Sequence, residues 1–199
     1  MIKKMRKRRL RIGMKLLLIV LLLLGIGGIW QNAMMKIESR KHAPKGQIYH
    51  INAHDMHLYG VGKGEVTVVF IPGSGTPSAY TDFYYLQNKL QPYSRTVSYD
   101  HAGFGWSGKT DIPRTIDTVV DELHELLQKA GENPPYILVG HSLASLEAIR
   151  YAQKYPGEVK GIVLLDGGSP EYYAKDSETK SYWINRIFAG FRATGVIRH

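Results

Sequence analysis

The hydrophobic pattern divides the chain into a charged head, one long apolar run and a series of short strand-like and helix-like segments. Residues 16–30 are uninterrupted apolar sequence, and no charged residue occurs between Leu16 and Met35. About 20 residues of helix cross the hydrocarbon core of a bilayer, so residues 16–35 predict one transmembrane helix. Trp30 suits the far membrane interface, and Lys15 can reach the near one.

Beyond a polar linker at residues 36–46, strand and helix patterns alternate along the chain. The predicted elements are a β-hairpin at 47–59, strands at 66–71, 96–99, 136–139 and 161–165, and helices at 80–90, 116–130 and 143–154. This alternation predicts an α/β fold, in which a mostly parallel sheet carries helices on both faces. We therefore expect a basic head (1–15), an anchor (16–35), a linker (36–46), an α/β core (47–170) and a final aromatic-rich segment (171–199).

The charge distribution changes the meaning of the formal net charge of +9. Eight basic residues and no acidic residue lie within the first 15 positions, which leaves 18 basic against 17 acidic residues in the rest. The fold therefore has no basic excess for nucleic acid. The basic head instead predicts an N-terminus on the cytoplasmic side of the cell membrane and a domain on the outer side. The alternative is a cleaved signal peptide that releases a secreted domain.

The segment from Ile137 to Leu146 places a serine between an apolar strand and a helix. It contains Gly140-His141-Ser142-Leu143-Ala144, which matches the Gly-x-Ser-x-Gly nucleophile elbow except for Ala144 in place of the last glycine. Small residues are needed there because the strand and helix backbones nearly touch. A serine hydroxyl becomes a useful nucleophile only when it is held exposed beside a general base, and this turn exposes it.

Two further segments stand in a fixed order before this elbow. The first runs from Val66 to Gly75, an apolar strand that ends in Pro-Gly-Ser-Gly, and the second is Tyr99-Asp-His-Ala-Gly-Phe-Gly-Trp-Ser107. Together the three segments resemble the α/β-hydrolase family over roughly residues 47–170. This resemblance implies a serine hydrolase that cleaves small-molecule ester or amide bonds through an acyl-enzyme. It also implies that residues 171–199 begin a cap, although amphipathic packing on the domain explains them equally.

The resemblance assigns roles to particular residues. Ser142 is the implied nucleophile, and the N–H groups of Leu143 and Ser74 (or Gly75) form the implied oxyanion hole. Asp166, which follows a strand, is a weak candidate for the triad acid, and Asp100 is expected to hold its own turn through side-chain to backbone bonds. No metal or organic cofactor is implied, and the chain has no cysteine.

One motif indicates a different function. Residues 103–110 satisfy Gly-x-x-x-x-Gly-Lys-Thr, the P-loop pattern of nucleotide-binding proteins. A P-loop opens directly into a helix, whereas Pro113 follows here and disfavours helix at the residue before it. A nucleotide-binding function is therefore the less favoured alternative.

The triad of this family continues with an acid and then a histidine after the serine. The only histidine after Ser142 is His199. We therefore expect the chain as given to be catalytically incomplete, either as a truncated hydrolase or as a non-catalytic pseudoenzyme or binding protein. In that case the apolar strand at 161–165 would be an exposed edge, which is prone to aggregation.

Overall fold

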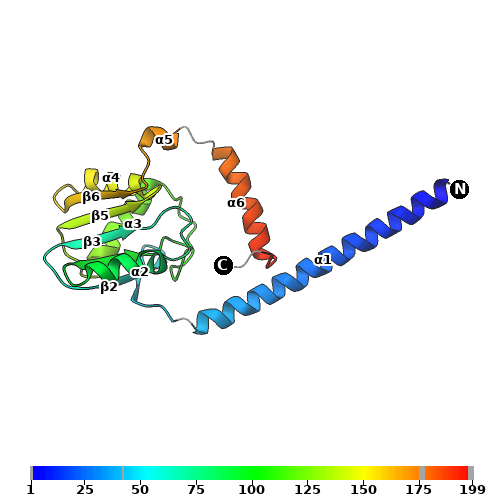
Figure 1. Ribbon diagram of the computed structural model, residues 1–199, viewed down its shortest axis with the longest axis horizontal. Helices are drawn as coiled ribbons and strands as arrows, with labels where there is room; N and C mark the ends of the chain where they lie inside the picture. The colour runs from blue at the N-terminus through cyan, green and yellow to red at the C-terminus, as the bar shows by residue number, and fades with distance from the viewer. Residues whose placement is uncertain (1, 42, 175–177, 197–199) are drawn as a thin grey trace. The chain divides into compact units, whose positions relative to one another are not determined.

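The computed structural model of the protein describes residues 2–41, 43–174 and 178–196. In chain order, its elements are α1 (Ile2–Lys41), β1 (Gln47–Ile51), β2 (His54–Val61), β3 (Thr67–Ile71), α2 (Ala79–Leu90), β4 (Arg95–Tyr99), α3 (Ile116–Lys129), β5 (Tyr136–His141), α4 (Ala144–Lys154), β6 (Val159–Leu165), α5 (Pro170–Ala174) and α6 (Glu178–Ala193) (Figure 1). Each strand and helix predicted between residues 47 and 165 is present, with ends that differ by no more than two residues.

The six strands form one mixed sheet in the order β1-β2-β4-β3-β5-β6. β1 and β2 form the predicted hairpin, and β2 also pairs antiparallel with β4. The other neighbours, β4 with β3, β3 with β5 and β5 with β6, are parallel. The predicted α/β fold with a mostly parallel sheet is therefore confirmed.

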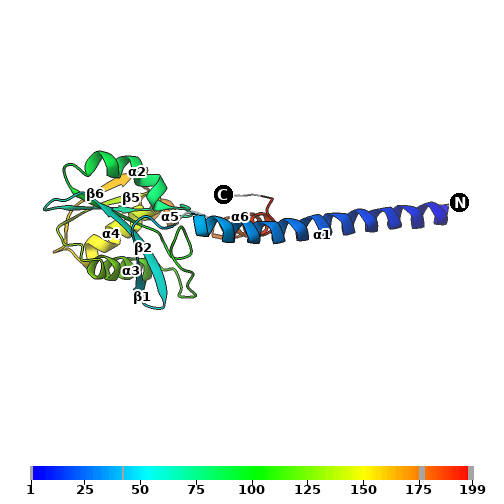
Figure 2. The ribbon, with the colours of Figure 1, turned by 90° about the horizontal axis from the view of Figure 1, so that it is seen from below.

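Helices cover both faces of this sheet, as Figure 2 shows with α2 on one side and α3 and α4 on the other. The α2 face is small, and Phe83 of α2 stacks on Phe70 of β3 with 4.9 Å between ring centroids. The larger core lies under α3 and α4, where Tyr99, Tyr136 and Tyr151 are fully buried. Burial of such large side chains supplies most of the hydrophobic stabilisation of the fold.

The pattern of α3 explains why it begins and ends where it does. Its apolar residues recur at spacings of three and four, so that one side of the helix enters the core. The Thr115 side chain caps the start by accepting a hydrogen bond from the N–H of Thr118. Gly131, the predicted stop, has φ +70°, a left-handed conformation that terminates the helix.

Helix α1 extends further than the sequence pattern predicted. It continues to Lys41, through most of the segment expected to be a linker. Residues 36–41 contain no proline or glycine, and the first proline is Pro44, so nothing in this segment stops a helix that is already formed. Within the part of the chain described, residues 11–38 of α1 are the one helix long and apolar enough to cross a membrane.

Strand β6 ends the sheet as described, because β5 is its only neighbour there. Ile162, Val163 and Leu164 are 38%, 44% and 44% exposed, although all three are large and apolar. Residues 171–174 and 178–193, within the segment expected to begin a cap, are helical as α5 and α6.

Candidate active site

Ser142 lies at the apex of the turn between β5 and α4. Its φ is +52°, a left-handed conformation that a non-glycine residue rarely adopts and that is typical of strained functional turns. Gly140 makes the turn possible, because a Cβ there would lie only 2.7 Å from the carbonyl oxygen of Ala144. The close approach of strand and helix that the sequence implied is therefore present, and Ala144 is tolerated in place of glycine.

Backbone hydrogen bonds hold this turn on the end of β6. The N–H of Ser142 donates to the carbonyl of Leu165 over 3.0 Å, and the carbonyl of Ser142 accepts from the N–H of Ser145 over 3.0 Å. Ser145 is fully buried, and its hydroxyl donates to the carbonyl of Gly168. The backbone of Ser142 is therefore fixed, while its side chain has no hydrogen bond within the described residues.

The loop after β3 lies against the same turn. A Cβ on Gly73 would be 3.2 Å from the carbonyl oxygen of His141 and 3.4 Å from Cβ of Ser142. Ser74 and Gly75 follow directly, and Gly75 has φ +80°. The backbone N–H groups of Ser74, Gly75 and Leu143 have no intramolecular acceptor among the described residues. Unpaired donors therefore flank Ser142 on both the elbow and this loop.

Asp100 links the neighbouring segments, and its role in pinning its turn is confirmed. Its carboxylate accepts from the N–H of Trp106 (3.1 Å) within the turn, and from the N–H of Ala79 (2.8 Å) at the start of α2. Oδ2 also lies 2.8 Å from Nδ1 of His57, and both side chains are buried. Gly105 has no side chain because a Cβ would overlap this carboxylate.

The turn after β4 differs from a P-loop. The N–H of Gly103 donates to the carbonyl of Gly108, and the N–H of Gly108 donates to the carbonyl of Asp55 in the hairpin. No helix begins until Ile116. The N–H groups of these two glycines are therefore hydrogen-bonded within the fold and do not face a phosphate at a helix N-terminus.

Asp166 follows the residue of β6 that is hydrogen-bonded to the elbow, but its side chain is unpaired among the described residues. It follows Leu165, which accepts the Ser142 hydrogen bond, and it has φ +50°. Its side chain is exposed and has no hydrogen bond or ion pair among the described residues. His199, the histidine that follows the serine, lies outside the described residues.

A buried cluster between the first turn of α4 and the end of β4 was not predicted from the sequence. The carboxylate of Glu147, in the first turn of α4, accepts from the hydroxyl of Tyr99 (3.3 Å) and contacts Nε2 of His101 at 3.0 Å. Burial first, and then the charge of Glu147, hold the pKa of Tyr99 well above its ordinary value of 10. A signal was available, because position 147 is three residues after Ala144 and four before Tyr151, both on the buried side of α4.

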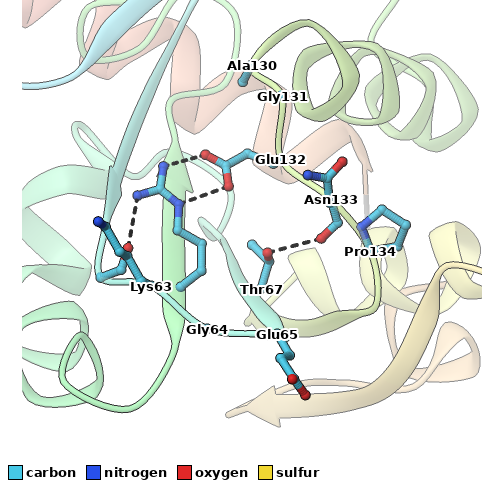
Figure 3. Close-up of a pocket in the computed structure, with 11 residues that line it drawn as sticks. Lys63, Gly64, Glu65, Thr67, Ala130, Gly131, Glu132, Asn133 and Pro134 are labelled. Atoms are coloured by element: carbon cyan, nitrogen blue, oxygen red, sulfur yellow. Dashed lines mark hydrogen bonds and ion pairs between the residues drawn. The ribbon is translucent and has the colours of Figure 1, made fainter.

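A cavity of about 530 Å³ lies away from this site (Figure 3). Its lining comes from the starts of β3 and β4 and the segment before β5, including Lys63, Thr67, Arg95 and Glu132. These are the amino ends of the parallel strands, whereas Ser142 follows the carboxyl end of β5. Arg95 is already paired with Glu132, so the cavity offers no free guanidinium. Among the residues that the structure describes, no cluster of three His, Cys, Asp or Glu side chains could hold a metal ion.

Comparison with known proteins identifies relatives of this arrangement. Residues 66–194 match the family model described as alpha/beta hydrolase fold. The protein YbdG of Bacillus subtilis is 34% identical over 145 residues, which cover 73% of this chain and 45% of YbdG. A cis-3-alkyl-4-alkyloxetan-2-one decarboxylase of Shewanella oneidensis is 30% identical over 123 residues, covering 59% of this chain and 37% of that enzyme.

Solved structures with a similar fold include proteins of the same kind. A variant of the meta-cleavage product hydrolase CumD superposes with a TM-score of 0.57 at 26% identity, covering 62% of this chain and 45% of that one. Est816, an N-acyl homoserine lactone degrading enzyme, gives 0.61 at 19% identity, covering 73% and 54%, and this likeness concerns the fold alone. The chain thus spans about half the length of the relatives it matches, or less.

Proposed function

Because the chain belongs to the α/β-hydrolase fold family, we propose that Ser142 is the nucleophile of a serine hydrolase that cleaves small-molecule esters or amides. The observation that carries this proposal is the left-handed turn that holds Ser142 beside two sets of unpaired backbone N–H groups. Relatives with enzyme names support the class, among them a (lyso)-N-acylphosphatidylethanolamine lipase of Bos taurus.

In the proposed reaction, Oγ of Ser142 bonds to the carbonyl carbon of the substrate while its proton passes to a general base. The carbonyl oxygen takes the negative charge and accepts hydrogen bonds from the N–H groups of Leu143 and Ser74, with Gly75 as the alternative to Ser74. The leaving alcohol or amine takes the proton, and water then hydrolyses the acyl-enzyme. No described histidine contacts Ser142, so we assign the base to none of them. Asp166 is the candidate acid.

The experiment is labelling of the full chain with a fluorophosphonate probe, alongside turnover of a short-chain activated ester. We expect slow labelling of wild type in the absence of a triad base, with fluoride leaving as the serine oxygen bonds to phosphorus, and no labelling of Ser142→Ala. Ser94→Ala is the matched control, because Ser94 directly precedes β4, at the amino end of that strand, whereas Ser142 follows the carboxyl end of β5. Labelling that survives Ser142→Ala would contradict the proposal.

The rate of ester turnover also tests whether the chain supplies a triad base. Without a triad base, roughly 1000- to 10,000-fold catalysis over water remains from the oxyanion hole and binding. Turnover at ordinary esterase rates that Ser142→Ala abolishes would show that the chain as given holds or recruits a base. Asp166→Asn would then test the acid.

We further propose that α1 anchors the protein in the cell membrane, with the N-terminus inside and the domain outside. The support is the eight basic residues ahead of a charge-free stretch in a helix long enough to span. Protease added to intact spheroplasts should degrade the domain and spare the head. A protected domain contradicts this topology, and a soluble protein beginning near Ala33 or Met34 identifies a signal peptide.

A further inference from the structure

Glu147 is a buried carboxylate in the helix that follows the candidate nucleophile. It lies in the first turn of α4, five residues after Ser142, and its side chain is only 7% exposed. Burying a carboxylate costs several kcal/mol unless its oxygens are paired. Here two donors from the end of β4, the Tyr99 hydroxyl and the His101 ring, converge on Oε2.

The acceptor chemistry of an ionised Glu147 assigns the donors. A carboxylate can only accept, so Nε2 of His101 carries the hydrogen in the contact with Glu147. The Tyr99 hydroxyl lies 3.1 Å from the same nitrogen and donates to Glu147. The raised pKa of Tyr99 keeps this donor protonated throughout the neutral range. The three side chains therefore form a closed arrangement with both hydrogens directed at Oε2.

These contacts connect the two sides of the candidate oxyanion hole. On one side, Glu147 belongs to the helix that begins just after Leu143. On the other, His101 follows Asp100, whose carboxylate holds the N–H of Ala79 at the end of the loop that contains Ser74. The N–H of Gly105 adds a second tie to this loop through the carbonyl of Pro77.

We propose that Glu147 is a positioning residue that, through His101, sets the placement of the Leu143 N–H relative to the loop that carries Ser74. This inference rests on the proposed role of Ser142. Positioning matters because a displacement of about 1 Å in a catalytic group can cost roughly 100-fold in rate. Removing an oxyanion donor altogether costs about 100- to 1000-fold.

The chain contains a matched control. Glu158 also accepts from a tyrosine and contacts a histidine, since Tyr151 donates to it over 2.8 Å and Nε2 of His124 lies 3.1 Å away. Glu158 directly precedes β6, at the amino ends of the parallel strands, whereas Ser142 lies at their carboxyl ends. The side chain of Glu158 is 27% exposed. A purely structural Glu–His–Tyr cluster is therefore available for comparison in the same molecule.

The first measurement is the rate of fluorophosphonate labelling of Ser142 in the full chain. We expect Glu147→Leu to slow labelling by at least about tenfold. Glu147→Gln should stay within about threefold of wild type, because its amide oxygen still accepts from His101. Glu158→Leu should also stay within about threefold, whatever its effect on melting temperature. His101→Leu serves as the second variant if Glu147→Leu does not fold.

The second measurement is hydrogen–deuterium exchange of the same variants, which needs no catalysis. We expect Glu147→Leu to speed exchange in both residues 72–79 and residues 142–146, and Glu158→Leu to leave both segments unchanged. If wild type is not labelled at all, the proposed function fails and the exchange data alone decide the inference. Equal labelling losses in the two leucine variants, or exchange changes that do not separate them, overturn it.

Discussion

Asp100→Asn tests the buried carboxylate that joins the loop after β3 to the turn after β4. In the wild type this group accepts two backbone hydrogen bonds, of 2.8 and 3.1 Å, and pairs with His57. An asparagine of the same size offers one oxygen to one backbone donor and turns its NH₂ group toward the other. One backbone N–H is then left without an acceptor in a buried turn.

The expected cost follows from these contacts. An unsatisfied buried donor costs about 1–3 kcal/mol, and hydrogen bonds to a charged group contribute about 1.5–3 kcal/mol each. We therefore expect Asp100→Asn to lower the free energy of unfolding by about 3 kcal/mol. For a domain of this size that corresponds to a drop in melting temperature of roughly 6–12 °C.

The assay is thermal unfolding in detergent micelles, followed by near-ultraviolet circular dichroism. Asp111→Asn is the control, because Asp111 is exposed and has no side-chain partner among the described residues. A double-mutant cycle with His57→Gln measures how much of the loss belongs to the contact between His57 and Asp100. If Asp100→Asn melts within about 2 °C of the control, the reasoning that this carboxylate organises the two loops is refuted.

Three further predictions concern other parts of the fold. Gly140→Ala should lower the free energy of unfolding by about 1–3 kcal/mol, because its Cβ would press on the backbone of Ala144. Gly157→Ala, which has open space around it, should leave the free energy of unfolding unchanged, and urea titration compares the two variants. Stability should fall as the pH rises from 10 to about 12, because burial, and then the hydrogen bond to Asp121, raise the pKa of Tyr155 to about 12 above its ordinary 10. The neutral phenol is favoured in the folded state, so its contribution is complete below pH 10 and disappears above 12. Tyr155→Phe should make the dependence shallower in alkaline titrations without abolishing it, because the pKa of the buried Tyr99 is also raised. Val163→Lys should reduce concentration-dependent association in light scattering, because it places a charge on the exposed β6 edge, and an association that does not respond to it would show that contacts form elsewhere.

Local patterns sufficed to predict the strands, the helices and the position of Ser142. The close approach of strand and helix at the serine turn involves Gly140 and Ala144, each two residues from Ser142, so the sequence signature and the geometry coincide there. The end of α1 was missed because a polar composition does not by itself stop a helix, and residues 36–41 contain no helix breaker.

The pairing of side chains could not be predicted in the same way. Glu147 meets His101 across 46 residues of sequence, and His57 meets Asp100 across 43. In a sequence these residues have the same appearance as solvated charges. Only the strand order brings them into contact, because it places β2 next to β4, and β3 alone between β4 and β5, the strand that leads into α4.

The hydrogen bond from Ser142 to Leu165 has a consequence for how the family can vary its chemistry. The turn that bears Ser142 is held by β5, β6 and the start of α4, which all lie within the 30 residues from Tyr136 to Leu165. Its placement is thus a property of a short contiguous module. Segments that deliver an acid, a base or a cover over the substrate can therefore change in sequence and length without altering the turn that bears the serine.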